Sequence, residues 1–320
     1  MTRIGQNPAK FVKNVAKPAR ITVAVLNYIP FLSGFYAEMD GVLKACLNSI
    51  YQTKLDEDFD VLVFDNGSCD EIKQFLLKEQ AEKRIQYLIF SEKNLGKGGA
   101  WNMILDGAPG EIIAYTDNDC LFTPDWLRKS LDILETFPNV GMVTARPFRT
   151  NADLYTATLE WADKDPETEH EQGDLIPFEV FREFDLSLGQ SEDEIAAHYA
   201  ETTDHRLTYH GVNAMVGASH WQFTAYKKVL REFLPFQMDR PMGQVRQLDT
   251  RMNEKGYLRL MTEDPCAMNM SNTLDSSLAQ TGEKSGKKEN RKNRIAEIPA
   301  VKKVLLGAYN RIFHLYYDKR

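Results

Sequence analysis

The sequence predicts an α/β fold in which a mostly parallel central sheet is flanked by helices, and two observations support this prediction. Short runs rich in β-branched and other apolar residues, such as residues 20–26 and 111–116, lack the polar alternation of half-exposed strands. Such runs are typical of strands buried on both faces of a parallel sheet. Between them lie longer segments whose apolar residues recur at helical spacing, as in residues 38–51. Strands that alternate with helices in this way indicate parallel βαβ units.

The individual elements follow from the same patterns. Strands are expected at residues 20–26, 59–64, 85–90, 111–116 and 140–145. Helices are expected between them, at residues 38–51, 70–82 and 94–106. A further helix is expected to begin at Pro124 with Thr123 as its N-cap, because proline suits the first helical position. After residue 205, a helix that ends before Gly256 and several short strands complete the sheet.

Composition places the chain among ordinary globular proteins, with 320 residues, 43% hydrophobic residues and 27% charged residues. The cysteines show no metal-binding spacing, so neither a zinc site nor a disulfide framework is indicated, and a reducing compartment fits best. They are Cys46, Cys69, Cys120 and Cys266. No run of apolar residues is long enough for a transmembrane helix, and the basic N-terminus is not followed by the apolar region of a signal peptide. We therefore expect a cytoplasmic protein.

The net charge of −7 is unevenly distributed along the chain. Residues 1–20 contain five basic and no acidic side chains, and residues 281–320 contain eleven basic and four acidic side chains. The region between these tails is strongly acidic, which argues against nucleic-acid binding by the main body.

Residues 151–204 alone contain sixteen acidic and two basic residues, and they break the alternation of strands and helices. This segment is interpreted as an insertion, either a lid or binding loop or a solvated excursion. Ser191, followed by Glu194, predicts the start of a helix within it.

Two carboxylates one residue apart follow the strand expected at residues 111–116, in the sequence Asp117-Asn118-Asp119. Carboxylate oxygens are ligands that hard divalent cations prefer, and such a cation commonly pairs with a diphosphate. Surface turns are also rich in Asp and Asn, so the motif alone is a weak signal. Its position favours a ligand site, because open α/β sheets bind ligands beyond the carboxyl ends of their strands.

Three loops are expected at the carboxyl ends of neighbouring strands, at residues 65–68, 94–97 and 117–119. Their sequences resemble family 2 glycosyltransferases of the GT-A fold. That family has a strand ending in Asp-x-Gly-Ser, a helix start Asn-x-Gly-x-x-x-Ala-x-Asn and an Asp-x-Asp at the next strand end. The middle element is matched here by Asn94, Gly96, Ala100 and Asn102. The resemblance covers about residues 20–275 and is strongest over residues 60–125.

The resemblance implies an inverting, hexosyltransferase-like enzyme that moves a sugar from a nucleoside-diphosphate donor, with a UDP-sugar favoured, to a carbohydrate or lipid-linked acceptor. It implies Mn²⁺ or Mg²⁺ as cofactor, with Asp119 as the direct ligand and Asp117 nearer the ribose, reaching the metal through water. Asp65 is expected to accept a hydrogen bond from the base or ribose, and Lys97 to reach the nucleotide or its phosphates. The residues expected to bind the nucleotide sugar are Asn27, Asp65, Asn94, Gly96, Lys97, Asp117 and Asn118.

The expected catalytic base is Asp249. Relatives usually carry an acidic pair before an Arg and a Gly-aromatic step, and Arg251 and Gly256-Tyr257 match the latter features. Within residues 247–249 only Asp249 is acidic. A carboxylate within hydrogen-bond reach of the acceptor hydroxyl is sufficient for this role. Asp239 and Asp264 are rival candidates, and a helix-surface position for Asp249 is the plainer alternative.

A second departure from the family lies at Asn269, where many relatives have a histidine that completes the metal shell. An amide oxygen is an acceptable ligand for magnesium or manganese, so metal use is weakened without being excluded. His210 and His220 are possible substitutes, although a single histidine in a core strand is usually structural.

The resemblance also suggests how the chain is divided. Residues 1–19 form a basic arm, residues 20–150 the nucleotide-sugar-binding half, residues 151–204 the acidic insertion, residues 205–274 the acceptor-side half, residues 275–297 a linker and residues 298–320 an amphipathic helix. The basic and aromatic residues of this last helix predict peripheral contact with an anionic membrane surface, at the inner face of the membrane. The same apolar face would equally suit the catalytic domain or a second subunit of a homo-oligomer.

Two other functions are compatible with parts of the sequence. A non-catalytic GT-A-like protein that binds carbohydrate or nucleotide sugar would explain the departures at residues 247 and 269. A sugar-nucleotide synthase has a similar sheet, but the glycine-rich signature expected after the first strand is missing from residues 26–30.

Overall fold

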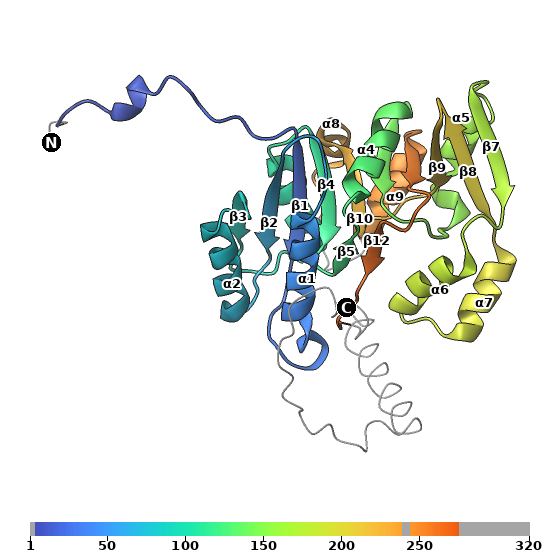
Figure 1. The fold of residues 1–320 in the computed structure, drawn as a ribbon, viewed down its shortest axis with the longest axis horizontal. Coiled ribbons are helices and arrows are strands. Elements are labelled where there is room, and N and C mark those ends of the chain that lie inside the picture. Colours follow the sequence, from blue (N-terminus) through green and yellow to red (C-terminus); the bar gives the residue numbers. More distant parts are fainter. Residues whose placement is uncertain (1–3, 239–243, 275–320) are drawn as a thin grey trace, which may run out of the picture. The chain divides into compact units, whose positions relative to one another are not determined.

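The computed structural model describes residues 4–238 and 244–274. In this part of the chain a ten-stranded sheet has the order β3-β2-β1-β4-β10-β6-β11-β9-β8-β7, so β3 and β7 form its two edges (Figure 1). The linker and the amphipathic helix predicted at residues 275–320 lie outside the described residues, as does Asp239. Among the described helices, none is long and apolar enough to cross a lipid bilayer.

The N-terminal half of the sheet is the parallel unit that the sequence predicts. Its strands are β1 (Ile21–Asn27), β2 (Phe59–Asp65), β3 (Tyr87–Phe90) and β4 (Ile112–Asp117). The helices between them are α1 (Met39–Tyr51), α2 (Asp70–Ala81) and α3 (Gly96–Gly107). In the register of the sheet Asn27 pairs with Asp65, and Leu26 pairs with Asp117. The carboxyl ends of β1, β2 and β4 therefore meet at one edge.

The second half of the sheet mixes strand directions. Strand β10 (Gln222–Tyr226) lies antiparallel between β4 and β6 (Val140–Thr144), and β11 (Leu258–Met261) runs parallel to β6. Strands β9 (Val212–Val216) and β8 (Asp204–Tyr209) continue the sheet as antiparallel neighbours. The accompanying helices are α4 (Trp126–Thr136), α8 (Lys227–Leu230) and α9 (Gln244–Glu254). The predicted fold class, an α/β sheet flanked by helices, is confirmed.

The acidic segment, residues 151–204, folds onto the sheet. It contains α5 (Thr156–Ala162), the edge strand β7 (Thr168–Gly173), α6 (Phe178–Ser187) and α7 (Glu192–Glu201). Strand β7 pairs antiparallel with β8. Helix α7 begins with the capping box predicted from Ser191 and Glu194. An apolar cluster lies beneath these helices and holds them against the sheet, and most of the acidic side chains lie on the outer faces, with Asp185 and Asp204 buried. The cluster consists of Phe148, Ile176, Phe181, Phe184, Ile195, Met215 and Met261.

The predicted start of α4 is wrong. The helix begins at Trp126, with Asp125 as the N-cap residue, and Thr123 is not its cap. The reason is a short strand that the sequence did not reveal, β5 (Cys120–Phe122), which pairs with β12 (Ala267–Asn269) in a separate two-stranded sheet. This pairing keeps the chain extended as far as Thr123, whose amide donates to the carbonyl of Cys266.

Trp101 of α3 fixes the helix against the centre of the sheet. Its side chain is completely buried, and its ring makes edge-to-face contacts with the rings of Tyr115, Phe223 and Phe236 at centroid distances of 5.2–5.7 Å. Aromatic pairs prefer this geometry, and each pair contributes about 0.5–1.5 kcal/mol beyond the burial of its area. Through the contact of Trp101 with Tyr115, α3 is packed in a fixed position against β4.

Candidate functional site

Three polar side chains meet where β1, β2 and β4 end. Asn27 donates from Nδ2 to Oδ1 of Asp65 at 2.7 Å, and its Oδ1 accepts from Nδ2 of Asn118 at 2.7 Å. Asn27 and Asp65 are fully buried, and Asn118 is nearly so. Parallel strands end at the same edge of a sheet, which is why residues 38 and 91 positions apart come into contact. The sequence-predicted residues at these three strand ends are thus brought together.

Asp65 also organises the turn that follows β2. Its Oδ2 accepts a hydrogen bond from the amide of Ser68 at 3.1 Å, and the Ser68 hydroxyl accepts from Asn27 Nδ2 and from the amide of Ile29. Each oxygen of the carboxylate therefore already has a hydrogen-bond partner within the protein, and the expected contact of Asp65 with the base or ribose stays a prediction. Ser68 had no assigned role in the sequence analysis, although its place in the Asp-x-Gly-Ser turn was a signal.

The loop before α3 is tied to the same turn. Asn66 donates from Nδ2 to Oδ1 of Asn94 at 3.0 Å and accepts from the amide of Leu95 at 2.9 Å. Asn94 Oδ1 also accepts from the amide of Gly96, whose φ of +68° opens the helix. Gly67 is required at this point because its φ is +92°, and a Cβ there would lie 3.3 Å from the backbone nitrogen of Asn94. These contacts place the N-terminus of α3 beside the strand ends.

Asp117 is held from two sides. Lys97 Nζ of α3 lies 2.6 Å from its Oδ2, and the hydroxyl of Tyr115 donates to its Oδ1 at 2.5 Å. The ammonium group of Lys97 also lies 5.7 Å from the ring centres of Trp101 and Tyr115. Tyr115 is a site residue that was not predicted, although alternation along a strand places residues 115 and 117 on one face and would have indicated it.

Asp119 has less compensation of its negative charge than Asp117, because the ammonium group of Lys97 is paired with Asp117. It lies two residues beyond Asp117, and burial together with the negative charge of Asp117 raises the pKa of Asp119 to about 7, while Lys97 acts in the opposite direction. Two carboxylates therefore share one lysine cation at this edge of the sheet. A group with this imbalance favours a proton or a metal cation as a further partner.

Asn269, at the position where the resemblance implies a histidine, lies next to the acid pair. In the β5–β12 pairing Asn269 is the partner of Cys120, and the amide of Met270 donates to the carbonyl of Asp119 at 2.8 Å. The side-chain oxygen of Asn269 accepts from the amide of Ser271. Across residues 4–238 and 244–274, no group of three or more His, Cys, Asp or Glu residues is placed to hold a metal ion. Further ligands of a cation at this edge can come from a diphosphate and water.

The candidate base lies in a buried network. Asp249 is 3% exposed, its Oδ1 accepts from Arg259 at 2.6 Å and its Oδ2 lies 2.7 Å from Nδ1 of His220. Its rival Asp264 is exposed and forms an ion pair with Lys129. The two histidines considered as metal ligands are separated, since His210 occupies the turn between β8 and β9 and contacts Glu167.

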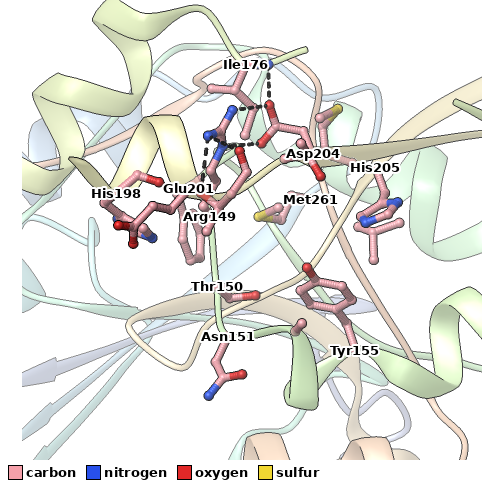
Figure 2. Close-up of a pocket in the computed structure, with 16 residues that line it drawn as sticks. Arg149, Thr150, Asn151, Tyr155, Ile176, His198, Glu201, Asp204, His205 and Met261 are labelled. Carbon is pink, nitrogen blue, oxygen red and sulfur yellow. Dashed lines mark hydrogen bonds and ion pairs between the residues drawn. The ribbon is translucent and has the colours of Figure 1, made fainter. Parts of the chain in front are cut away.

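A cavity of about 550 Å³ lies beside the acidic segment and is lined by none of the predicted site residues (Figure 2). Arg149 forms one wall, and its guanidinium group donates to both carboxylate oxygens of Asp204 at 2.8 and 3.0 Å. It also donates to the carbonyls of Tyr199 and Thr202, and it stacks on the Tyr199 ring at 4.0 Å. These bonds join the end of β6 to α7 and β8. Arg149 is therefore a structural anchor of the acidic segment.

Residues 35–184 match the sequence model described as glycosyl transferase family 2. The expected resemblance to family 2 glycosyltransferases is confirmed over these residues, and the observed α/β sheet has the architecture expected of the GT-A fold.

Two proteins of similar sequence are named for polymer biosynthesis, and one of them is named as a glycosyltransferase. The succinoglycan biosynthesis protein ExoW of Rhizobium meliloti is 30% identical over 131 residues, which are 40% of this chain and 37% of that protein. The amylovoran biosynthesis glycosyltransferase AmsE of Erwinia amylovora is 32% identical over 109 residues, 34% of this chain and 41% of that protein. The matched regions thus span less than half the length of these two relatives.

Two solved structures are also similar. The mannosyltransferase PcManGT of Pyrobaculum calidifontis, in complex with GDP-Man and Mn²⁺, has a TM-score of 0.44 and 18% identity, covering 78% of this chain and 56% of that one. S. aureus TarS 1–349 in complex with UDP-GlcNAc has a TM-score of 0.45 and 14% identity, covering 80% of this chain and 62% of that one.

Proposed function

We propose that the protein is an inverting glycosyltransferase that moves a sugar from a nucleoside-diphosphate donor to an acceptor hydroxyl. The observation that carries this proposal is the meeting of the Asn27–Asp65–Asn118 network, the Asp117–Asp119 pair and the start of α3 at one edge of the sheet. A donor of this kind needs a site for its nucleoside, a site for its diphosphate and a means of stabilising the leaving phosphate. The match of residues 35–184 to the family 2 sequence model supports the same conclusion.

The diphosphate end of the donor is proposed to lie at the N-terminus of α3. Amide groups at Gly96 and Lys97 are at the positive end of a 12-residue helix, where anions bind favourably. Lys97 adds a full positive charge, and it can exchange its bond to Asp117 for a bond to a phosphate oxygen. Uridine is the proposed nucleoside because of the sequence resemblance.

A divalent cation, Mn²⁺ or Mg²⁺, is proposed at Asp119. The residues present fit such an ion, because Asp119 has a raised pKa and its neighbour Asp117 adds a second negative charge. When bound, the ion would supply Lewis-acid stabilisation of the leaving diphosphate. Asp117, held by Lys97 and Tyr115, is proposed to orient the donor ribose and to reach the ion through water.

The acceptor is proposed to be a carbohydrate or a lipid-linked carbohydrate, in keeping with the polysaccharide-biosynthesis names of two relatives. A cytoplasmic location at the inner face of the membrane is part of the proposal and rests on scattered free cysteines and the basic C-terminal tail. The division of the chain at residues 20, 150, 204, 274 and 297 is likewise proposed.

A non-catalytic binding protein is the second candidate, and Asn269 is the observation that favours it. Incubation of the full chain with UDP-glucose, UDP-GlcNAc and GDP-mannose in Mn²⁺ distinguishes the two, since a transferase slowly transfers the sugar to water. We expect release of UDP from at least one UDP-sugar, measured by a coupled nucleotide assay. Binding of these donors without release of either nucleotide would support the non-catalytic candidate and refute the transferase.

A further inference from the structure

His220 lies in the loop between β9 and β10, at the same edge of the sheet as the acid pair. The next residue, Trp221, accepts a hydrogen bond at its carbonyl from the amide of Asp117 at 3.0 Å. The preceding residue, Ser219, donates its amide to the hydroxyl of Thr144 at 2.9 Å. The loop is thus attached to the ends of β4 and β6 on either side of His220. This places the backbone of His220 beside the strand end that carries Asp117 and Asp119.

The imidazole is oriented by Asp249. Nδ1 of His220 lies 2.7 Å from Oδ2 of Asp249, and the other oxygen of this carboxylate is paired with the fully buried Arg259 at 2.6 Å. An ionised carboxylate accepts hydrogen bonds and cannot donate them, so Nδ1 carries the hydrogen. In the neutral imidazole Nε2 then keeps a lone pair and is the basic atom. The His220 side chain is 31% exposed, whereas that of Asp249 is 4% exposed.

We propose that His220 takes the proton from the acceptor hydroxyl and that Asp249 is the residue that positions it. This inference rests on the proposed glycosyl transfer. In the reaction the hydroxyl proton moves to Nε2 of His220, the oxygen forms a bond to the anomeric carbon, and the bond from that carbon to the diphosphate breaks. The electron pair of the broken bond leaves with the nucleoside diphosphate. The imidazolium, paired with Asp249, later releases its proton to water.

Asp249 is poorly placed to accept the proton directly, for a physical reason. Both of its oxygens already have partners, and the carboxylate is almost inaccessible to an acceptor sugar. A general base must come within hydrogen-bond reach of the proton that it removes. An arrangement in which a buried carboxylate orients a more exposed histidine satisfies this requirement, as it does in other enzymes that activate hydroxyl groups.

A second His–Asp pair provides a matched control. Nδ1 of His198 in α7 lies 3.0 Å from Oδ2 of Asp185 in α6, and the His198 side chain is 35% exposed. Its exposure and its contact geometry resemble those of His220. It is attached to the acidic segment and makes none of the contacts with strand ends that locate His220.

The test compares His220→Gln and His198→Gln in the full chain, with release of UDP from a UDP-sugar and Mn²⁺ as the readout. We expect His220→Gln to lower kcat by about 10²–10⁴-fold, with the calorimetric Kd for UDP unchanged. His198→Gln should change neither quantity. In His220→Ala, added imidazole should restore part of the lost kcat, because the partly exposed position leaves room for it.

The test of Asp249 separates its positioning of the His220 imidazole from its contribution to the stability of the fold. Asp249→Asn leaves Arg259 without its buried counter-charge, so Asp249→Asn with Arg259→Met is measured alongside it. Both should lower kcat with little change in the KM for the donor. A His220→Gln kcat within twofold of the wild type would overturn the role of His220 alone. Absence of nucleotide release by the wild type would refute the proposed function itself.

Discussion

Replacement of Asp119 by alanine is expected to lower kcat for sugar transfer by about 10³-fold, because a Lewis-acid metal contributes several kcal/mol of transition-state stabilisation. The fold should be retained, since burial and the nearby charge of Asp117 both raise the pKa of Asp119, and the substitution removes this unfavourable buried charge. The measurements are the rate of UDP release in Mn²⁺ and the melting temperature of the variant.

The matched control for this variant is Asp132→Ala. Asp132 lies on α4, is about half exposed and, among the residues that the structure describes, pairs with Arg128 at 3.2 Å, so its removal should leave the rate unchanged. EDTA should reduce the activity of the wild type to the level of Asp119→Ala. Full activity in that variant, or full activity of the wild type in EDTA, would contradict the assignment of the metal to Asp119.

Replacement of Arg149 by methionine is expected to lower the free energy of unfolding by about 3–5 kcal/mol, the usual cost of leaving a buried charge unpaired. Arg149 and Asp204 are each 2% exposed at the side chain, and the guanidinium group also satisfies the carbonyls of Tyr199 and Thr202. Urea denaturation of the two proteins under identical conditions measures the difference.

An exposed arginine in the same segment provides the comparison. Arg182 pairs with Glu192 at 2.5 Å, but its side chain is 36% exposed and that of Glu192 is 58% exposed. Because exposed ion pairs contribute about 0–1 kcal/mol, Arg182→Met should be nearly neutral. Equal losses of stability in the two variants would show that Arg149 is not the anchor of the acidic segment.

The grouping of the site residues could be predicted from the sequence, because parallel strands end at one edge. Asn27, Asp65 and Asp117 were assigned to strand ends, and the register of the sheet brings those ends together. The hydrogen bonds inside the group could not be predicted. Whether Asp65 faces a ligand or Asn27 and Ser68 depends on side-chain rotamers, and the contact of Lys97 with Asp117 depends on how α3 packs.

The hydrogen-bond partners of Asp249 could not be predicted from the sequence either. Its helical position predicts a surface or site residue equally well, but its neighbours come from β11 and from the loop before β10. The several short strands predicted after residue 205 include β12. Its partner β5 could not be predicted, because three residues are too few to show periodicity and the two strands lie far apart in the chain.

In the acidic segment, residues 151–204, the composition alone does not predict that the segment packs against the sheet. Its sixteen acidic residues suggest a solvated face, and most of them do lie outside. A few apolar side chains, including Ile176, Phe181 and Ile195, nevertheless form a buried cluster with Met215 and Met261 of the sheet. Burial of such side chains contributes about 1.5–3 kcal/mol each, which is enough to fix the segment.

The most direct test of the donor site is calorimetric titration of UDP into the full chain in Mn²⁺ and, separately, in EDTA. The site described here predicts measurable binding in Mn²⁺, and binding at least tenfold weaker both in EDTA and in the Asp119→Ala variant. The acid pair, Lys97 and the start of α3 are then the residues that receive the diphosphate. UDP affinity that is identical with and without the metal, and unchanged in Asp119→Ala, would contradict a nucleotide-sugar site at this edge of the sheet.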